Sequence, residues 1–287
     1  MKIVLSPNPY RDKGLRAAQS AAKILKNAGV ETSMCLPFSV EGTNIEFPKH
    51  IELKDTREEL KNADMLICFG GDGTILHAAK DANEFRLPIL GVNLGSVGFM
   101  AELEQGELSL LSKLAAGKYS VEERMMLDVT ARRDGKVVFS DLALNDAVVT
   151  KGAVARVVDL EVFSDKVPIT DFAGDGVVVS TPTGSTAYSM SAGGPLVEPT
   201  AENIIVTPIC PHSVNARSFV LGAGRMVSVK LGRLSKKAAY LSSDGGKAFK
   251  LCGGDVLEIR RSQSVTRLVR LTGRSFYEVM SQKLGRM

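Results

Sequence analysis

Two patterns of hydrophobic and polar positions divide the chain into unlike parts. Over roughly the first 100 residues, short apolar runs alternate with segments of helical spacing. The runs at 2–5, 30–36, 65–69 and 88–93 predict buried strands, and residues 13–28 predict an amphipathic helix. Such alternation of strands and helices predicts a parallel sheet with helices on both faces.

From about residue 119 the helical spacing nearly disappears. Strand-like runs occur at 148–151, 156–163, 177–180, 204–208, 226–231, 238–242 and 256–260. Turn signals separate them, and 133–136 and 164–166 read as hairpin turns. A final strand and helix within 265–287, with the helix at 275–283, are expected to return to the first domain.

These patterns predict two domains. Residues 1–115, completed by 266–287, should form an α/β domain with a parallel, Rossmann-like sheet. Residues 116–265 should form an all-β domain of packed sheets.

Composition narrows the function classes only modestly. The 287 residues are 44% hydrophobic and carry a net charge of +4, with basic pairs scattered along the chain. No run of like charges suggests a nucleic-acid partner. The four cysteines lack C-x-x-C spacing and read as reduced thiols. No signal-peptide pattern or membrane-spanning stretch is apparent, so we expect a cytoplasmic protein without membrane contact.

The segment Gly70-Gly71-Asp72-Gly73-Thr74 lies between a predicted strand and a predicted helix. Glycines allow a ligand to approach the backbone, and the amides of such a turn suit phosphate oxygens. A carboxylate would repel a bound anion unless it accepts a proton or holds a metal ion. The turn therefore points to phosphoryl transfer, in which Asp72 either takes a proton from an attacking hydroxyl or holds a metal ion. The alternative is that Asp72 only caps the following helix.

Four further segments carry a family resemblance: 91–99, Leu144-Asn145-Asp146, 175–188 with the letters STPTGSTAY, and 208–213. Together with the glycine turn, and in this order, they resemble the NAD kinases over residues 1 to about 280. The glycine turn alone is less specific, because diacylglycerol kinases, sphingosine kinases and 6-phosphofructokinases carry versions of it.

The resemblance implies transfer of the γ-phosphate of ATP, or of another phosphoryl donor, to the 2′-hydroxyl of the adenosine ribose of NAD, with a divalent metal, most simply Mg²⁺. It implies that Asp72 is the catalytic base. The residues expected at the donor phosphates are Gly70, Gly71, Gly73 and Thr74. Leu76 and Phe99 are expected at the pocket wall, although Phe99 reads equally well as core. No dedicated protein cage for the metal is expected.

The same resemblance implies the NAD contacts. They are Asp72, Gly73, His77, Asn145, Asp146, Arg156, Asp175, Thr186, Ala187, Tyr188, Ser189, Met190 and Ser191. The Asn145 amide suits an adenine edge and Asp146 suits ribose hydroxyls. Many relatives have glutamate in place of Asp146, and some have a basic residue where this chain has Ala173. The alternative for the Asn145–Asp146 pair is an Asx turn.

Family members are homo-oligomers, so we expect a homodimer or homotetramer in which Asp175 and Arg156 contact substrate across subunits. Two other functions stay open at this point. One is a soluble lipid kinase with the same glycine turn, although no basic amphipathic helix suits a membrane surface. The other is a dinucleotide-binding sensor without catalysis, in which loss of Asp72 would be expected.

Overall fold

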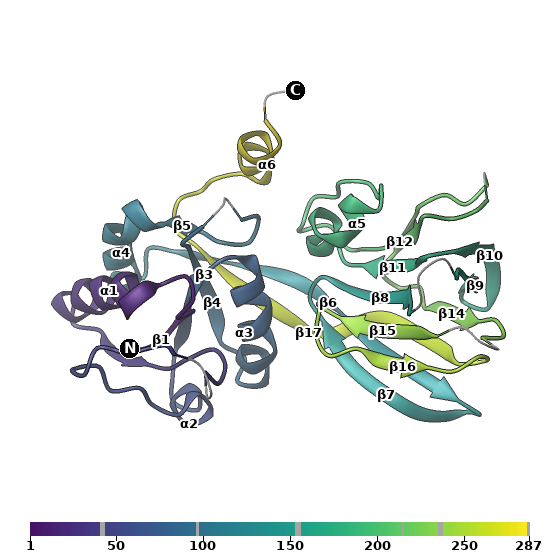
Figure 1. The fold of residues 1–287 in the computed structure, drawn as a ribbon. Coiled ribbons are helices and arrows are strands. Elements are labelled where there is room, and N and C mark those ends of the chain that lie inside the picture. The colour runs from purple at the N-terminus through teal and green to yellow at the C-terminus, as the bar shows by residue number, and fades with distance from the viewer. Residues whose placement is uncertain (41–43, 96–97, 153–155, 214, 235–237, 286–287) are drawn as a thin grey trace. The chain divides into compact units, whose positions relative to one another are not determined.

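The computed structural model describes residues 1–40, 44–95, 98–152, 156–213, 215–234 and 238–285. The chain forms two compact units (Figure 1). The first comprises Met1–Glu123 and Thr266–Met287, and the second Arg124–Val265. The first division, after Glu123, lies beyond the expected boundary at residue 115.

The first unit is built on a parallel sheet. Its strands are β1 (Lys2–Pro7), β2 (Glu31–Met34), β3 (Met65–Gly70), β4 (Pro88–Asn93), the short β5 (Leu103–Glu104) and the end of β17 (Val256–Arg270). The order is β2-β1-β3-β4-β17, and every pair is parallel. All six residues of β3 are buried, as expected of a strand covered on both faces. The predicted parallel α/β architecture is confirmed.

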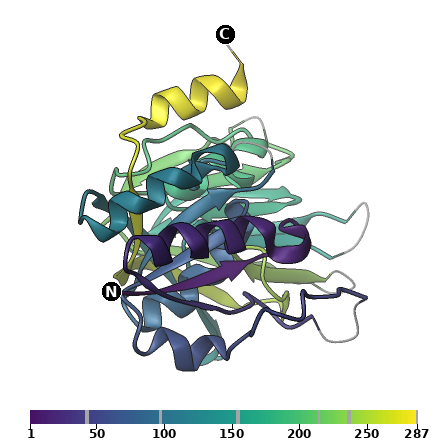
Figure 2. The ribbon, with the colours of Figure 1, turned by 90° about the vertical axis from the view of Figure 1, so that its left-hand side faces the viewer.

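Helices cover both faces of this sheet. The helices of this unit are α1 (Arg16–Asn27), α2 (Thr56–Leu60), α3 (Asp72–Glu84), α4 (Ser112–Ala115) and α6 (Phe276–Leu284), with 3-10 turns at Lys13–Leu15 and Gln105–Leu111. Helix α6 has no buried residue and does not cover the sheet. Figures 1 and 2 show α1 and α4 on one face and α3 on the other.

The first helix begins later than expected. The predicted helix 13–28 starts as α-helix only at Arg16, because Gly14 and Leu15 have φ of 65° and 53° and interrupt the helical path. The buried Asp12 carboxylate then accepts hydrogen bonds from the amides of Ala17 and Ala18 at 2.9 and 3.0 Å. These bonds satisfy two amides of the first turn.

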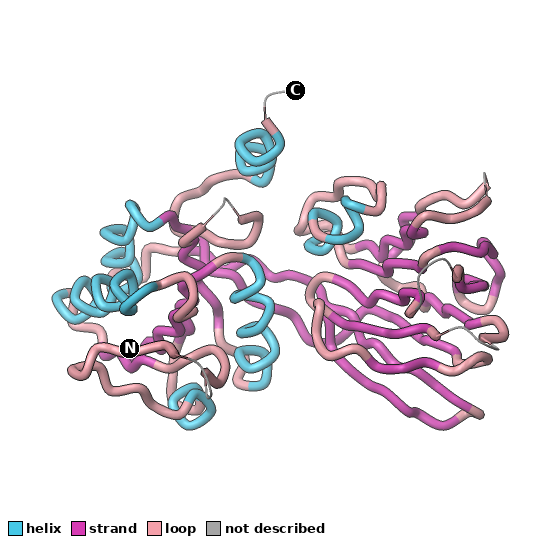
Figure 3. The backbone as a smooth tube through the Cα atoms, in the orientation of Figure 1, coloured by secondary structure: helices cyan, strands magenta, loops and turns pink. Residues whose placement is uncertain are grey.

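The second unit consists almost entirely of strands (Figure 3). They are β6 (Ser120–Arg133), β7 (Lys136–Ala143), β8 (Asp146–Lys151), β9 (Val158–Ser164), β10 (Val167–Gly174), β11 (Gly176–Ser180), β12 (Asn203–Ile209), β13 (Phe219–Gly222), β14 (Val227–Leu231), β15 (Ala239–Ser243), β16 (Phe249–Leu251) and the first part of β17. One antiparallel sheet has the order β13-β12-β11-β8-β15-β16, and β10-β9-β14-β17 with β6 and β7 form the other. Apolar residues from both sheets share one core, so the predicted all-β domain of packed sheets is confirmed.

Both predicted hairpin turns are present. Asp134 and Gly135 have φ of 50° and 76°, and Asp165 and Lys166 have 48° and 72°, the left-handed pair that a tight two-residue hairpin requires. Other boundaries differ. The strand expected at 156–163 begins at Val158, which leaves Arg156 outside it. The runs at 256–260 and from 265 belong to a single strand, β17.

The C-terminal part of β17 pairs with β4 through Arg267 and Leu268, so the predicted return of the chain to the first unit is confirmed. In the part of the chain that the structure describes, no helix is long and apolar enough to cross a membrane.

Candidate active site

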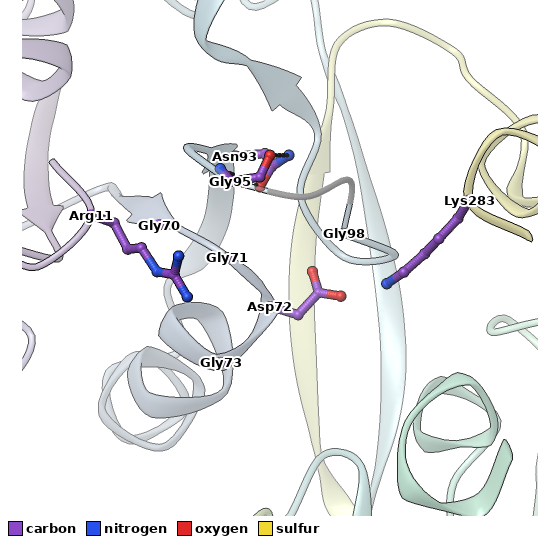
Figure 4. Close-up of a pocket in the computed structure, with 9 residues that line it drawn as sticks. All are labelled: Arg11, Gly70, Gly71, Asp72, Gly73, Asn93, Gly95, Gly98 and Lys283. Carbon is purple, nitrogen blue, oxygen red and sulfur yellow. Dashed lines mark hydrogen bonds between the residues drawn. The ribbon is translucent and has the colours of Figure 1, made fainter. Parts of the chain in front are cut away.

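The glycine turn forms one side of a pocket of about 250 Å³ in the first unit (Figure 4). Strand β3 ends at Gly70, and α3 begins at Asp72 with Gly71 as its N-cap. The lining residues are Arg11, Gly70, Gly71, Asp72, Gly73, Asn93, Gly95, Gly98 and Lys283. Three of the four residues expected at the phosphates are therefore in the lining. The fourth, Thr74, is buried beneath the turn.

Asp72 is held by backbone groups from another loop. Its Oδ2 accepts a hydrogen bond from the amide of Phe99 at 2.8 Å, and its Oδ1 accepts one from the amide of Met100 at 3.1 Å. No side-chain hydrogen bond caps the N-terminus of α3, so helix capping does not explain this aspartate. A carboxylate has about four acceptor positions, which leaves Asp72 free to accept a proton while it stays oriented.

Gly98 is the glycine on which this arrangement depends most directly. A Cβ on Gly98 would lie 2.3 Å from Asp72 Oδ1, so a side chain there would displace the carboxylate. We expect Gly98→Ala to lower activity about 100-fold, the usual scale for misplacing a catalytic group by an ångström. Gly106→Ala is the control, because a Cβ on Gly106 meets open space. Equal steady-state rates for the two variants would contradict this dependence.

A buried carboxylate absent from the sequence-based expectations ties the C-terminal segment to the same loop. Glu102 accepts hydrogen bonds from the amides of Leu271 and Thr272 at 2.7 and 2.6 Å, and from the Thr272 hydroxyl at 2.7 Å. Arg270 pairs with Glu102 and donates to the Met100 carbonyl at 3.1 Å. Arg270 and Glu102 are 168 positions apart, and no motif links them. The loop that orients Asp72 is thus fixed by the returning chain.

Three residues expected at this site lie outside the pocket lining. His77 is exposed on α3, with its ring 5.8 Å from that of Phe38. Leu76 is half-buried on the same helix. Phe99 is buried, and its ring packs at 6.2 Å from that of Phe276. The structure therefore favours a packing role for Phe99. Residues 96 and 97 of the segment 91–99, one of those that carry the family resemblance, lie outside the described residues.

A second cluster of expected site residues lies in the other unit, where β8 begins. The carboxylate of Asp244 accepts hydrogen bonds from the amides of Leu144, Asn145 and Asp146 at 2.7, 2.7 and 3.1 Å. Gly184 packs so closely on the same turn that a Cβ there would lie 2.1 Å from the Asn145 carbonyl oxygen. The sequence predicted the Asn145–Asp146 pair as part of the site but not the role of Asp244. Asp244 lies 99 positions after Asn145, and no motif links the two.

The side chains of this cluster are buried and incompletely bonded. Asn145 Oδ1 and Ser180 Oγ have no hydrogen-bond partner among the described residues. The Asx-turn alternative for Asn145 is thereby unsupported. Burial, and secondarily the charge of Asp244, raises the pKa of Asp146 to about 7. Buried polar atoms without partners are unusual and mark this turn as a place where a ligand can bond.

The segment after Ser180 forms the short turn Thr183–Thr186 and the helix α5 (Tyr188–Ser191). Two of the hydroxyls expected to contact NAD are already bonded within the protein. Thr186 donates to the Thr183 carbonyl, and buried Ser189 bonds to Thr207 at 3.0 Å. Tyr188 is exposed, and Ala187, Met190 and Ser191 are at least partly accessible. Tyr188 is therefore better placed than Ser189 to meet a ligand.

Asp175 lies apart from the Asn145 turn. Asp175 directly precedes β11 and forms a 2.6 Å ion pair with Lys151. This ion pair lies at one end of the paired strands β11 and β8, and Ser180 and Asp146 lie at the other end. Five strand residues separate these ends by roughly 16 Å. Arg156 is exposed. The structure thus does not bring Asp175 to the Asn145 turn of its own chain.

The chain matches two family models in the order of its two units. Residues 5–119 match the ATP-NAD kinase N-terminal domain, and residues 144–271 match the ATP-NAD kinase C-terminal domain. The NAD kinase of Acetivibrio thermocellus is 37% identical, over 99% of this chain and 97% of its own. That of Symbiobacterium thermophilum is 48% identical, over 77% of this chain and 78% of its own.

Solved structures give the same result. Yeast NADH kinase complexed with NADH matches with a TM-score of 0.84 at 26% identity, covering 100% of this chain and 88% of the other. An NAD kinase from Archaeoglobus fulgidus in complex with ATP matches with a TM-score of 0.74 at 26% identity, covering 98% and 99%. These matches place the protein among the phosphotransferases. The chain belongs to the NAD kinase family.

Proposed function

We propose that this protein is an NAD kinase that transfers the γ-phosphoryl group of ATP to the 2′-hydroxyl of the adenosine ribose of NAD, forming NADP. The observation that carries the proposal is the Asp72 carboxylate, fixed by two amides in a pocket lined by glycine backbone. The NADH and ATP complexes of the two structural neighbours support these ligand classes.

In this proposal Asp72 accepts the proton of the ribose hydroxyl as that oxygen attacks the γ-phosphorus of ATP. The bond from the γ-phosphorus to the β,γ-bridging oxygen breaks, and ADP leaves. Phosphoryl transfer passes through a loose transition state, so positioning and neutralisation of charge supply most of the acceleration. The glycine backbone allows phosphate oxygens to approach the amides of the turn and of the first turn of α3. The hydrogen bonds from Phe99 and Met100 keep the carboxylate in place while its remaining acceptor positions face the reaction.

A divalent metal fits this pocket as a partner of the donor phosphates. Among the described residues that line it, Asp72 is the only carboxylate. No group of three or more His, Cys, Asp or Glu side chains could hold a metal within the described ranges. Mg²⁺ commonly keeps several waters and binds through one or two carboxylates and substrate phosphates, so Asp72 could hold it. When bound, the ion would neutralise charge on the transferring phosphoryl group.

The Asn145 turn is proposed to bind NAD. The Asn145 amide suits the adenine edge, Asp146 suits ribose hydroxyls, and the exposed Tyr188 ring suits stacking on a base. We also propose a homodimer or homotetramer in which Asp175 and Arg156 meet the dinucleotide of a neighbouring subunit. Asp175 and Asp146 lie at opposite ends of β11 and β8, which supports the proposal that they contact NAD molecules bound to different subunits. Size-exclusion chromatography with light scattering tests it, and a fully active monomer would contradict it.

The decisive test is NADP formation from NAD, ATP and Mg²⁺ by the purified protein. We expect NADP to accumulate with equimolar loss of ATP. Phosphorylation of diacylglycerol in vesicles, without NADP formation, would establish the lipid-kinase alternative. Saturable NAD binding without turnover under any donor would establish the sensor alternative.

A further inference from the structure

Two cationic side chains from opposite ends of the chain line the Asp72 pocket (Figure 4). Arg11 follows β1, and Lys283 lies in the last turn of α6. Neither forms an ion pair with any carboxylate among the described residues, although the structure contains many surface ion pairs. Unpaired cations beside backbone amides suit an anion of high charge.

Arg11 is positioned by the same turn that carries Asp72. The loop before it is tied to the glycine turn through Asn8, whose side-chain amide donates to Thr74 Oγ1 at 3.1 Å and whose backbone amide donates to the Phe69 carbonyl at 2.8 Å. The Arg11 amide in turn donates to the Asn8 carbonyl at 3.0 Å. The guanidinium extends past Gly95, where a side chain would approach Arg11 Nη1. Its fork geometry can hold two phosphate oxygens at once.

Lys283 reaches the pocket through a helix that has little other reason to lie there. Helix α6 has no buried residue. Phe276 packs on Phe99, and a capping box formed by Ser275 and Glu278 begins the helix. Lys283 Nζ lies 4.2 Å from the centre of the Phe99 ring. Figure 4 shows its side chain extending from α6 toward Asp72.

The residues that hold α6 in place belong to the loop whose backbone amides bind Asp72. Glu102 holds Leu271 and Thr272, and Phe99 supplies both an amide to Asp72 and a ring to Lys283. The base and the terminal cation are thus attached to one loop. Lys283 is exposed, and a cation–π contact of an exposed cation is weak, so a phosphate can compete for Nζ.

We propose that Arg11 and Lys283 bind the polyphosphate of the phosphoryl donor from two sides of the glycine turn, and that α6 is present to supply the second cation. The inference rests on the proposed function for its choice of donor. It adds two binding residues and a role for the C-terminal helix. Because Nζ and the guanidinium contact the donor and not the dinucleotide, their loss should act on one substrate only.

The test compares Arg11→Gln and Lys283→Gln with the controls Lys13→Gln and Gln282→Ala, which alter exposed neighbours outside the lining. Losing a charge-assisted hydrogen bond to phosphate should raise KM for ATP about 10-fold, with KM for NAD unchanged. Calorimetric titration with magnesium tripolyphosphate gives a second readout, in which each variant should bind about 10-fold more weakly. Lys283→Arg should restore most of the binding.

Unchanged tripolyphosphate affinity and unchanged KM for ATP in both glutamine variants would overturn the inference, even with a fully active wild type. Equal loss for ATP and NAD would also overturn it, since that would indicate a structural effect. If the wild type binds tripolyphosphate through these two residues but forms no NADP, the inference stands and the proposed function fails.

Discussion

Replacing Asp72 by asparagine is expected to lower kcat for NADP formation by at least about 100-fold, because the ribose hydroxyl then lacks its proton acceptor. The dissociation constants for ATP and NAD should stay within a few fold of the wild type. Steady-state kinetics together with calorimetry of each ligand measures both.

The control for Asp72 must account for its structural contacts. Asparagine presents one NH₂ group, which would face the amide of either Phe99 or Met100 and leave that amide unpaired at a cost of about 1–3 kcal/mol. Asp81→Asn alters a carboxylate on the same helix outside the pocket and should leave kcat unchanged. An active Asp72→Asn enzyme would exclude the base role, and a loss of kcat matched by a loss of ligand affinity would show that Asp72 only positions the loop.

Asp146→Asn is expected to stabilise the protein at neutral and alkaline pH. The pKa of Asp146 is raised to about 7 from 3.8, so the folded state holds a proton that the unfolded state loses. The contribution of Asp146 to the free energy of unfolding is greatest below pH 4 and falls as the pH rises toward 7. Above pH 7 the free energy of unfolding is lower than below pH 4 by at most about 4 kcal/mol. Asparagine has no such titration. Urea unfolding at pH 8 should show a gain of roughly 1–3 kcal/mol, after the cost of a buried amide.

The same variant should bind NAD more weakly, because the residue that limits stability is the one proposed to bond the ribose. Asp171→Asn, which removes an exposed carboxylate from the same unit, should change neither property. The interpretation requires the difference between wild type and Asp146→Asn to shrink toward pH 4. A constant difference across pH 4–8 would show that Asp146 does not titrate in this range.

The local pattern of hydrophobic and polar residues was enough to predict the fold class of both units. The apolar run Met65–Phe69 predicts the buried strand β3, and the loss of helical spacing after residue 119 predicts the all-β unit. The residues at which helices and strands begin and end were harder to predict from the sequence. The start of α1 depends on the positive φ of Gly14 and Leu15 and on the Asp12 carboxylate, and no periodicity encodes these features.

The residues of the candidate site also fall into those that the sequence predicts and those that only the fold reveals. The glycine turn and the Asn145–Asp146 pair are contiguous in sequence, so their chemistry is legible in the residues themselves. The resemblance implies that His77 contacts NAD, and the structure shows its ring 5.8 Å from that of Phe38 and outside the pocket lining, which no sequence motif indicates. Asp244, Glu102 and Lys283 carry no motif, and their roles arise from contacts with residues far away in the sequence.

The sequence by itself determined the two fold classes, the phosphate-binding turn with its carboxylate, and the family resemblance, because each depends on neighbouring residues. Only the tertiary structure decided what orients Asp72, what braces the Asn145 turn and which cations reach the pocket. Those features depend on where the folded chain brings distant backbone amides and charges together, and hydrophobic periodicity does not specify the partners of individual polar side chains.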